Sequence, residues 1–273
     1  MSASPKVAFL VAGVQKGGTS ALFEYLRDMP GLQLPAVKEA HFFDDETIDW
    51  ARPDHAAYHQ LFEDDGRLRG EATPIYLYWP NALERVAAYN PAMKLILLFR
   101  DPIERAWSHW KMEYAKGKER EPFAWCIREG RTRLDDGDPA APGFHRVFSY
   151  VERGFYGRQV ERLLRLFPRE QCLFLLSEQL RDDAPGVLAA VCAFLGQSPP
   201  ADIAPRIVHP ARTQQYPSEL LTSDIDLLRE LYTPDMKQFS QLTQIDPSTW
   251  TRNWSGHNKG QPQALDADQH RQE

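Results

Sequence analysis

The sequence predicts an α/β protein whose central, mainly parallel sheet is flanked by helices. Short apolar, β-rich runs recur along the chain, and stretches with helical spacing lie between them. Strands that alternate with helices form parallel sheets, because the chain has to be carried back before the next strand can run in the same direction. A glycine-rich turn follows the first run and leads directly into the first helical stretch. These three observations together predict the fold class.

The first strand and helix are predicted close to the N-terminus. Val7 to Val14 is apolar almost throughout, as a strand buried on both faces would be. Thr19 to Met29 follows with apolar residues at helical spacing, which predicts a helix with one buried face. Pro30-Gly31 is a strong signal for the end of that helix.

Two more strands are predicted at Lys94 to Phe99 (KLILLF) and at Gln171 to Leu176 (QCLFLL). Pro102 introduces the helical stretch IERAWSHWKMEYAKG, since proline is favoured at the first position of a helix. The helical stretch YGRQVERLLRLFP precedes the third strand. Helical spacing from Ser218 to Gln244 predicts a helix that caps the domain.

The 273 residues, 42% hydrophobic and 26% charged, indicate an ordinary globular protein. We predict one domain over residues 1–254 and a disordered tail over residues 255–273, where apolar residues nearly vanish. The net charge of −6 argues against a general nucleic-acid-binding protein. The first apolar run is too short to span a bilayer, so no membrane segment is predicted.

The three cysteines, Cys126, Cys172 and Cys192, are widely spaced and form no CxxC pair. This pattern indicates neither a disulfide framework nor a zinc site. Cys172 and Cys192 lie in apolar runs, where we expect buried thiols. A reducing compartment fits this pattern, and we predict a cytoplasmic protein.

The turn from Gly13 to Ser20 (GVQKGGTS) has the features of an anion-binding loop. Glycines let backbone N–H groups approach the ligand, and the helix that follows adds partial positive charge. The predicted ligand-binding residues here are Lys16, Gly17, Gly18, Thr19 and Ser20. A Walker loop has its lysine directly after the last glycine, whereas here Thr19 follows that glycine and the lysine lies three residues earlier. The turn therefore predicts a P-loop-like, three-layer fold that binds a single 5′-phosphate rather than a nucleoside triphosphate.

A second phosphate site is predicted around the strand that ends at Phe99. Arg100 follows this strand directly, at the carboxyl edge where open α/β sheets bind their ligands. Ser108 lies about two turns into the next helix, so it can face the same crevice. A guanidinium and a hydroxyl suit a phosphate monoester. The alternative for Arg100 is a salt bridge to Asp101 or Glu104.

These segments resemble the PAPS-dependent sulfotransferases, where PAPS is 3′-phosphoadenosine 5′-phosphosulfate. KEAHFFD, at residues 38–44, is similar to a motif of the heparan sulfate N- and O-sulfotransferases, and YVERGFYGRQVERLLRLFP is similar to their later helix. The resemblance covers roughly residues 6–250. It implies that the first loop binds the 5′-phosphosulfate and that Arg100 and Ser108 bind the 3′-phosphate. It adds Tyr156 from the later helix, and Arg212 and Thr213 from a lid over the nucleotide, to the cofactor-binding residues.

The chain departs from the heparan enzymes at two places. Ala72 stands in GEATP, where those enzymes commonly carry a lysine. Residues 212–217 read RTQQYP, in place of a more basic KGRxxP-like loop that follows a cysteine-bridged insertion.

The resemblance also implies the chemistry. Glu39 would be the base for the acceptor hydroxyl, and we expect partial burial beside Phe42 and Phe43 to raise its pKa. His41 is the rival base, because imidazole titrates near neutrality and alternation in an extended segment would place both side chains on one side. Lys16 would stabilise the leaving oxygen, and adenosine 3′,5′-bisphosphate would be the product.

No metal is predicted, because His109, His145 and His209 lack metal-ligand spacing. Two other functions were weighed: a P-loop NTP-dependent phosphotransferase and a catalytically inactive nucleotide-binding module. The acceptor, the choice between O- and N-sulfation, and the oligomeric state stay open. Four aromatic residues, which would form either a stacking wall for the acceptor or part of the core, are Trp79, Trp107, Trp110 and Tyr114.

Overall fold

The computed structural model describes residues 5–135, 143–199 and 215–250. Within these ranges the central sheet is five-stranded and parallel, with the order β2-β3-β1-β4-β5. The strands are β1 (Phe9–Gly13), β2 (Leu32–Gln33), β3 (Leu68–Ala72), β4 (Lys94–Phe99) and β5 (Cys172–Leu176). Because the strands are parallel, their carboxyl ends all lie at one edge of the sheet.

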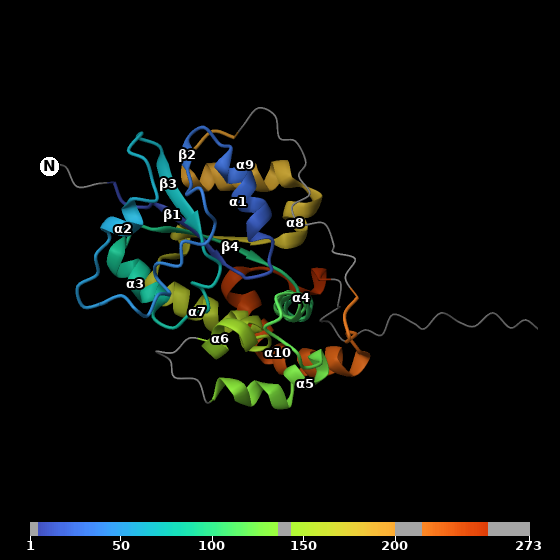
Figure 1. The fold of residues 1–273 in the computed structure, drawn as a ribbon. Coiled ribbons are helices and arrows are strands. Elements are labelled where there is room, and N and C mark those ends of the chain that lie inside the picture. Colours follow the sequence, from blue (N-terminus) through green and yellow to red (C-terminus); the bar gives the residue numbers. More distant parts are fainter. Residues whose placement is uncertain (1–4, 136–142, 200–214, 251–273) are drawn as a thin grey trace, which may run out of the picture.

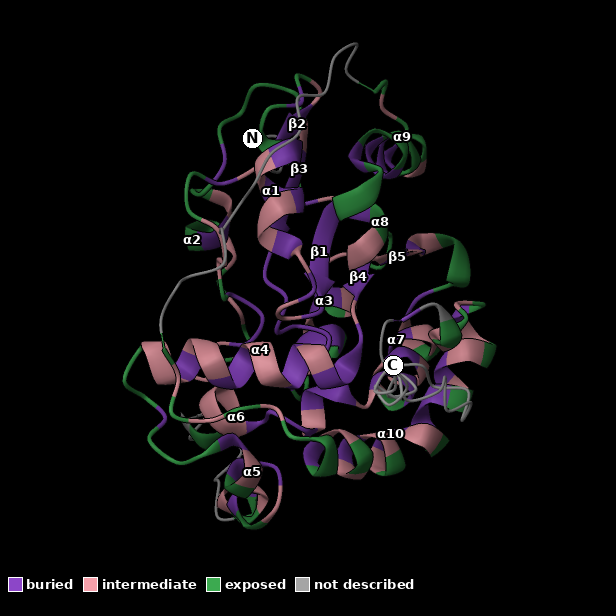
Figure 2. Cartoon of the chain, turned by 90° about the vertical axis from the view of Figure 1, so that its right-hand side faces the viewer, coloured by how far each residue is buried: buried purple, intermediate pink, exposed green. Residues whose placement is uncertain are grey.

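Helices cover both faces of this sheet (Figure 1). One face packs against α1 (Thr19–Arg27), α8 (Ser177–Asp182) and α9 (Ala184–Leu195), through a core that includes Val11 and Leu98. The other face packs against α3 (Ala82–Tyr89), α4 (Pro102–Ala115), α7 (Tyr156–Leu166) and α10 (Thr222–Thr243), through a core that includes Leu10 and Leu97. Neighbouring residues of a strand therefore enter different cores, and the central strands are buried (Figure 2).

The remaining elements are short. They are α2 (Ala56–His59), α5 (Phe123–Cys126), α6 (Gly143–Phe148) and four 3₁₀ turns: η1 (Glu129–Leu134), η2 (Glu152–Gly154), η3 (Arg169–Gln171) and η4 (Pro247–Thr249). Helix α4 lies below the sheet in Figure 1, next to the loop that joins β1 to α1.

The predicted α/β class with a P-loop-like parallel sheet is confirmed. Strand β4 has the predicted bounds, α4 begins at Pro102 as predicted, and the helix predicted at residues 218–244 is α10. The first strand is shorter than predicted and occupies Phe9–Gly13. Strands β2 and β3 and helix α9 had no sequence prediction. The predicted tail at residues 255–273 lies outside the described residues.

The three cysteines are free and buried, as the sequence analysis expected for Cys172 and Cys192. In the described ranges, no helix combines the length and apolar character that a membrane crossing would need.

Candidate active site

The loop after β1 folds tightly against β4. The N–H of Gly17 donates to the carbonyl of Val14 at 2.9 Å, and the N–H of Val14 donates to the carbonyl of Leu98 at 3.0 Å. A Cβ at position 17 would lie 2.3 Å from the carbonyl oxygen of Leu98. No real Cβ approaches an oxygen so closely, so this turn of the loop needs glycine.

The loop places the N-terminus of α1 at the carboxyl edge of the sheet. Gly18 precedes the helix in the left-handed region, with φ 95°, and no side chain caps the first turn. The first N–H groups of a helix have no acceptor inside the helix, and this turn carries no acidic residue that would compete for them. Thr19 and Ser20 are the first two residues of this helix. The loop and the uncapped helix N-terminus are the features on which the prediction of anion binding rests.

Lys16 reaches from this loop towards α4. Its Nζ lies 3.7 Å from Sδ of Met112, a weak acceptor, and no carboxylate in the described part of the chain lies within ion-pair distance of it. Burial, together with the positive charges of Lys116 and Arg100, lowers the pKa of Lys16. An arriving anionic group would relieve this repulsion, so the site favours a negatively charged ligand.

Arg100 and Ser108 lie where the sequence placed them, after β4 and on α4. Both are half-buried. Arg100 contacts the Glu104 carboxylate at 3.6 Å, so the salt bridge weighed as its alternative role is present in the structure. Because this guanidinium is 31% exposed, it is also accessible to a ligand.

Tyr156 is fully buried behind Arg100. Its hydroxyl donates to the backbone carbonyl of Arg100 at 3.0 Å, and its ring packs against Phe99 and Phe239. Tyr156 therefore supports the backbone at the end of β4, and its side chain has no exposed surface that a ligand could contact. Arg212 and Thr213, the predicted lid residues, lie outside the described residues.

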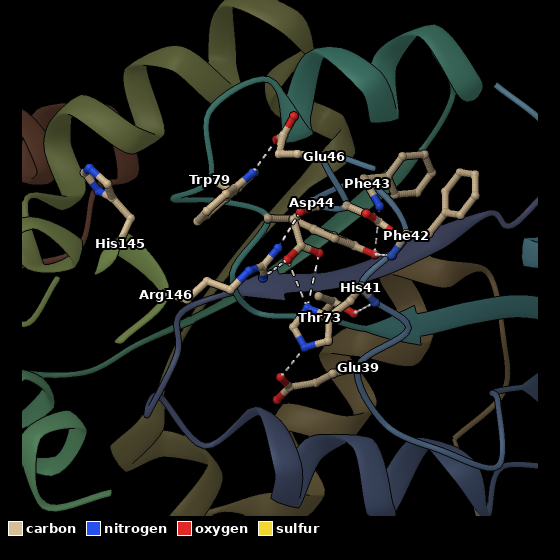
Figure 3. Close-up of polar contacts among 12 residues, drawn as sticks. Glu39, His41, Phe42, Phe43, Asp44, Glu46, Thr73, Trp79, His145 and Arg146 are labelled. Carbon is tan, nitrogen blue, oxygen red and sulfur yellow. Dashed lines mark hydrogen bonds and ion pairs between the residues drawn. The ribbon is translucent and has the colours of Figure 1, made fainter. Parts of the chain in front are cut away.

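Glu39 and His41 form a contact pair opposite the loop (Figure 3). Nε2 of His41 lies 3.2 Å from Oε2 of Glu39, and Nδ1 of His41 lies 3.0 Å from Oδ2 of Asp44. The expected proximity is present, but its predicted reason, an extended segment, is wrong. Glu39 and His41 have φ values of 68° and 53°, in the left-handed region that residues other than glycine rarely adopt.

The surroundings of His41 shift its pKa strongly. Hydrogen bonds with Asp44 and then with Glu39 outweigh burial and raise the pKa of His41 to about 9. At neutral pH both ring nitrogens therefore carry protons and donate to the two carboxylates. In this arrangement His41 has no free lone pair with which to act as the base.

The expectation that burial would raise the pKa of Glu39 is wrong. Burial acts in that direction, but the hydrogen bond from His41 and the charge and hydrogen bond of Lys38 outweigh it and lower the pKa to about 2. Lys38 Nζ donates to Oε1 of Glu39 at 2.6 Å. The carboxylate is therefore ionised over the whole neutral range and able to accept a proton, but a pKa so far below neutrality makes it a weak base in this arrangement.

Two arginines join this segment to the rest of the site, and the sequence analysis predicted neither. The guanidinium of Arg146 donates to the side chain and the backbone carbonyl of Asp44 (Figure 3). Arg153, which is 3% exposed, donates to Oε1 of Gln15 in the loop at 2.6 Å. Nη2 of Arg153 also donates to the carbonyls of His145 and Arg146, at 3.0 and 3.1 Å.

A pocket of about 380 Å³ lies between the loop, the Glu39 segment and the end of α4. Its charged lining residues are Glu39, His41, Asp45, Glu113, Lys116, Lys118 and Arg146. None of the four aromatic residues considered for an acceptor wall lines it. Trp79 and Trp110 are buried in the core, and Trp107 is stacked on Trp110, so core packing accounts for these three side chains.

No group of three or more histidine, cysteine, aspartate or glutamate side chains suited to a metal occurs in residues 5–135, 143–199 and 215–250. Of the three histidines that lacked metal-ligand spacing, His109 is buried beside Tyr150 and His145 contacts Tyr78. His209 lies outside the described residues.

A parallel sheet, an anion-binding loop before α1 and cationic side chains at the carboxyl edge define a nucleotide-binding protein of the P-loop-like α/β class. The chain belongs to the sulfotransferase family, because residues 6–257 match the family model described as the sulfotransferase domain.

Solved and curated relatives agree with this assignment. The crystal structure of a sulfotransferase from Alicyclobacillus acidocaldarius superposes with a TM-score of 0.72 at 28% identity, over 90% of this chain and 99% of that one. Human heparan sulfate glucosamine 3-O-sulfotransferase 3B1 is 33% identical over 192 residues, which are 68% of this chain and 45% of the relative. The mouse heparan sulfate glucosamine 3-O-sulfotransferase 5 is 29% identical over 195 residues, 70% of this chain and 53% of the relative. The chain thus spans about half the length of these curated relatives.

Proposed function

We propose that the chain transfers a sulfuryl group from PAPS to a hydroxyl of a carbohydrate or another small polyhydroxy acceptor. The pocket in which the loop meets the Glu39–His41 pair carries this proposal. Gln15 lines it from the loop, and Glu39 and His41 line it from the other side. A group held on the loop would therefore face an ionised carboxylate across the pocket. Membership of the sulfotransferase family supports the donor.

In the proposed reaction the acceptor oxygen attacks the sulfur, and the bond from sulfur to the bridging oxygen of PAPS breaks. Glu39 accepts the proton of the hydroxyl as this oxygen becomes positively polarised. Lys16 donates to the bridging oxygen, which leaves as part of the 5′-phosphate of adenosine 3′,5′-bisphosphate. Most of the rate enhancement then comes from positioning and charge stabilisation. His41, already protonated, holds Glu39 in place.

The nucleotide is proposed to lie along the carboxyl edge of the sheet. The loop residues Lys16 to Ser20 hold the 5′-phosphosulfate, and Arg100 and Ser108 hold the 3′-phosphate. Arg100 would exchange its 3.6 Å contact with Glu104 for the phosphate, which offers a shorter and bidentate partner. Tyr156 supports the backbone of Arg100, and Arg212 and Thr213 are proposed to close over the nucleotide.

The acceptor side carries many charged groups. Carboxylates and cations both line the pocket, and its apolar lining comes from Pro74, Ile75 and Val147 rather than from aromatic rings. Such a wall offers hydrogen bonds to several hydroxyls and no flat surface for stacking a phenol. The relatives are named heparan sulfate glucosamine 3-O-sulfotransferases, which supports oxygen as the accepting atom.

Calorimetry and a transfer assay test this function. Adenosine 3′,5′-bisphosphate should bind in EDTA, because the site neutralises phosphates with lysine and arginine, whereas ATP with Mg²⁺ should bind weakly. Incubation with ³⁵S-labelled PAPS and a panel of sugars, phenols and amines should label a polyhydroxy acceptor. Binding of the nucleotide with no labelled product from any acceptor would support the inactive module. Tight binding of ATP that requires Mg²⁺ would support a phosphotransferase.

We propose the cytoplasm as the compartment, since the three cysteines are free thiols. Cell fractionation checks this, and recovery of the protein from an oxidising compartment would contradict it.

A further inference from the structure

Three consecutive backbone N–H groups of the segment that carries the Glu39–His41 pair are bound by two hydroxyls. The N–H of His41 donates to Oγ1 of Thr73 at 3.5 Å. The N–H groups of Phe42 and Phe43 donate to the hydroxyl of Tyr76 at 3.0 and 3.4 Å. Thr73 follows β3 directly and Tyr76 lies in the turn just after it, so the end of that strand supports the segment.

Both hydroxyls interact with one carboxylate. Thr73 Oγ1 donates a hydrogen bond to Oε2 of Glu71 at 2.6 Å, and the hydroxyl of Tyr76 also interacts with Glu71. Tyr58 donates to Oε1 of Glu71 at 3.3 Å. Glu71 lies on β3 and is 1% exposed, so it has no role in contacting a ligand.

The segment needs such support because of its backbone. Glu39 and His41 both lie in the left-handed region, which persists in residues other than glycine only when the surroundings fix it. One further contact acts here: the N–H of Glu39 donates to the carbonyl of Ala72 at 3.1 Å. The residues from Glu71 to Tyr76 thus determine where the two side chains point.

We propose that Glu71 is a positioning residue for the reaction, acting through the hydroxyls of Thr73 and Tyr76 to hold the Glu39–His41 pair in its reactive orientation. The proposal rests on the proposed function, since it names what orients the base of that reaction. Glu71 touches neither the pocket nor the loop, so its effect on turnover has to pass through the segment at residues 39–43.

The charge state of Glu71 predicts a distinctive pH dependence, which can be measured. Burial, opposed by hydrogen bonds from Thr73, Tyr76 and Tyr58, raises the pKa of Glu71 to about 7. The groups that face it are these three hydroxyls and, at longer range, the carboxylate of Asp44. Above this pH the ionised carboxylate accepts from all three hydroxyls. Below it, the acid carries a proton of its own that needs an acceptor, and one of the supporting bonds is lost.

Glu71→Gln tests the proposal, because the amide keeps the size of the side chain but can accept on one oxygen only. The matched control is Glu119→Gln, since Glu119 is also buried and accepts from a tyrosine hydroxyl, that of Tyr150, at 2.9 Å, away from the segment. The measurements are kcat, KM for the acceptor, affinity for adenosine 3′,5′-bisphosphate and the titration of the His41 imidazole by NMR.

We expect Glu71→Gln to lower kcat about 100-fold, the loss that a small misplacement of a reacting group causes, with nucleotide affinity unchanged. Wild type should lose kcat as the pH falls through about 7, and the variant should lack this limb. The His41 pKa should fall from about 9 towards 6.5 in the variant and stay near 9 in Glu119→Gln. Wild-type kcat and an unshifted His41 pKa in Glu71→Gln would overturn the proposal.

If Glu71→Gln does not fold, a second pair of variants tests the same proposal about Glu71. Thr73→Val removes the hydroxyl at constant shape, and Thr73→Ser keeps it, so Thr73→Ser should retain much more of kcat and of the His41 shift. Equal losses in both would indicate a packing role and overturn the proposal. If wild type transfers no sulfuryl group, the proposed function fails, yet the His41 titration still reports whether Glu71 positions the segment.

Discussion

Nη1 of Arg153 donates a 2.6 Å hydrogen bond to Oε1 of Gln15, and this contact ties the nucleotide loop to the acceptor side of the site. The same guanidinium binds the backbone carbonyls of His145 and Arg146, and Arg146 in turn binds Asp44. One buried cation therefore connects the loop to the segment of Glu39 and His41.

Arg153→Lys should be strongly destabilising. Lysine keeps the charge, but its three donors lie on one nitrogen, which cannot reach Gln15, Ser149 and the two backbone carbonyls that the three nitrogens of Arg153 serve. Lost buried hydrogen bonds of this kind cost about 2–4 kcal/mol in the free energy of unfolding. Urea denaturation measures this loss. A variant within 0.5 kcal/mol of wild type, on the order of surface substitutions, would show that the contact is unimportant for stability.

Gly17→Ala should abolish nucleotide binding. The new Cβ would lie 2.3 Å from the carbonyl oxygen of Leu98. The backbone at Leu98 cannot move away without displacing β4. The matched control is Gly31→Ala, whose Cβ would meet the flexible end of Gln197 at 2.1 Å. Calorimetry with adenosine 3′,5′-bisphosphate should find wild-type affinity in the control alone. Equal affinity in both variants would mean that the loop adapts.

Glu39→Gln should lower kcat by roughly two to four orders of magnitude, the usual range for a lost general base. Nucleotide affinity should stay near wild type, because Glu39 faces the loop across the pocket. Steady-state kinetics with a fixed acceptor checks this. Retention of most activity would exclude Glu39 as the proton acceptor.

Arg100→Ala and Ser108→Ala should weaken binding of adenosine 3′,5′-bisphosphate by about 2–3 and about 1 kcal/mol, respectively. The difference arises because the guanidinium bonds carry charge. Adenosine 5′-phosphosulfate, which lacks the 3′-phosphate, is the control ligand. If both variants lose the same factor with either ligand, the two side chains do not act on the 3′-phosphate.

The stabilising effect of His41 should depend on pH. Its pKa is raised from 6.5 to about 9, so its ion pairs stabilise the fold fully below pH 6.5 and this contribution is lost as the pH rises through 9. The pKa of Glu39 is lowered from 4.5 to about 2, so its contribution is lost as the pH falls through that range. Urea denaturation of wild type and His41→Gln should show the largest difference between about pH 4.5 and 6.5. If the difference in the free energy of unfolding between wild type and His41→Gln grew from pH 7 to pH 10, the assignment of a protonated His41 would be wrong.

The sequence predicted an element correctly where the residues of that element determine its bounds. The apolar run of β4 and the proline at the start of α4 set the bounds of these elements, and the glycines of the loop identify the anion site. Strand β3 escaped prediction because LRGEA contains two charged residues that the fold buries. Arg69 donates to the carbonyls of Pro5 and Glu63, and Glu71 accepts from hydroxyls of Thr73 and Tyr58, so partners outside the strand make this burial tolerable.

The sequence predicted which residues form the acceptor side, but not how these residues are arranged. Motif resemblance named Glu39 and His41, yet it indicates neither the left-handed backbone of both residues nor the raised pKa of His41, which follows from hydrogen bonds with Asp44 and Glu39. Arg146 lies 102 positions from Asp44, and nothing local in either segment indicates the pairing. Contacts over such separations are fixed by the topology of the sheet.

The separation between Gln15 and Arg153, 138 positions, has a consequence for how the protein is made. A chain that is still on the ribosome and ends before Arg153 contains the whole nucleotide loop but lacks the guanidinium that holds it. Domains of this size fold through partly ordered intermediates, and an N-terminal intermediate would have no complete pocket. A ligand that binds the complete pocket would therefore stabilise the chain only once Arg153 has joined the fold.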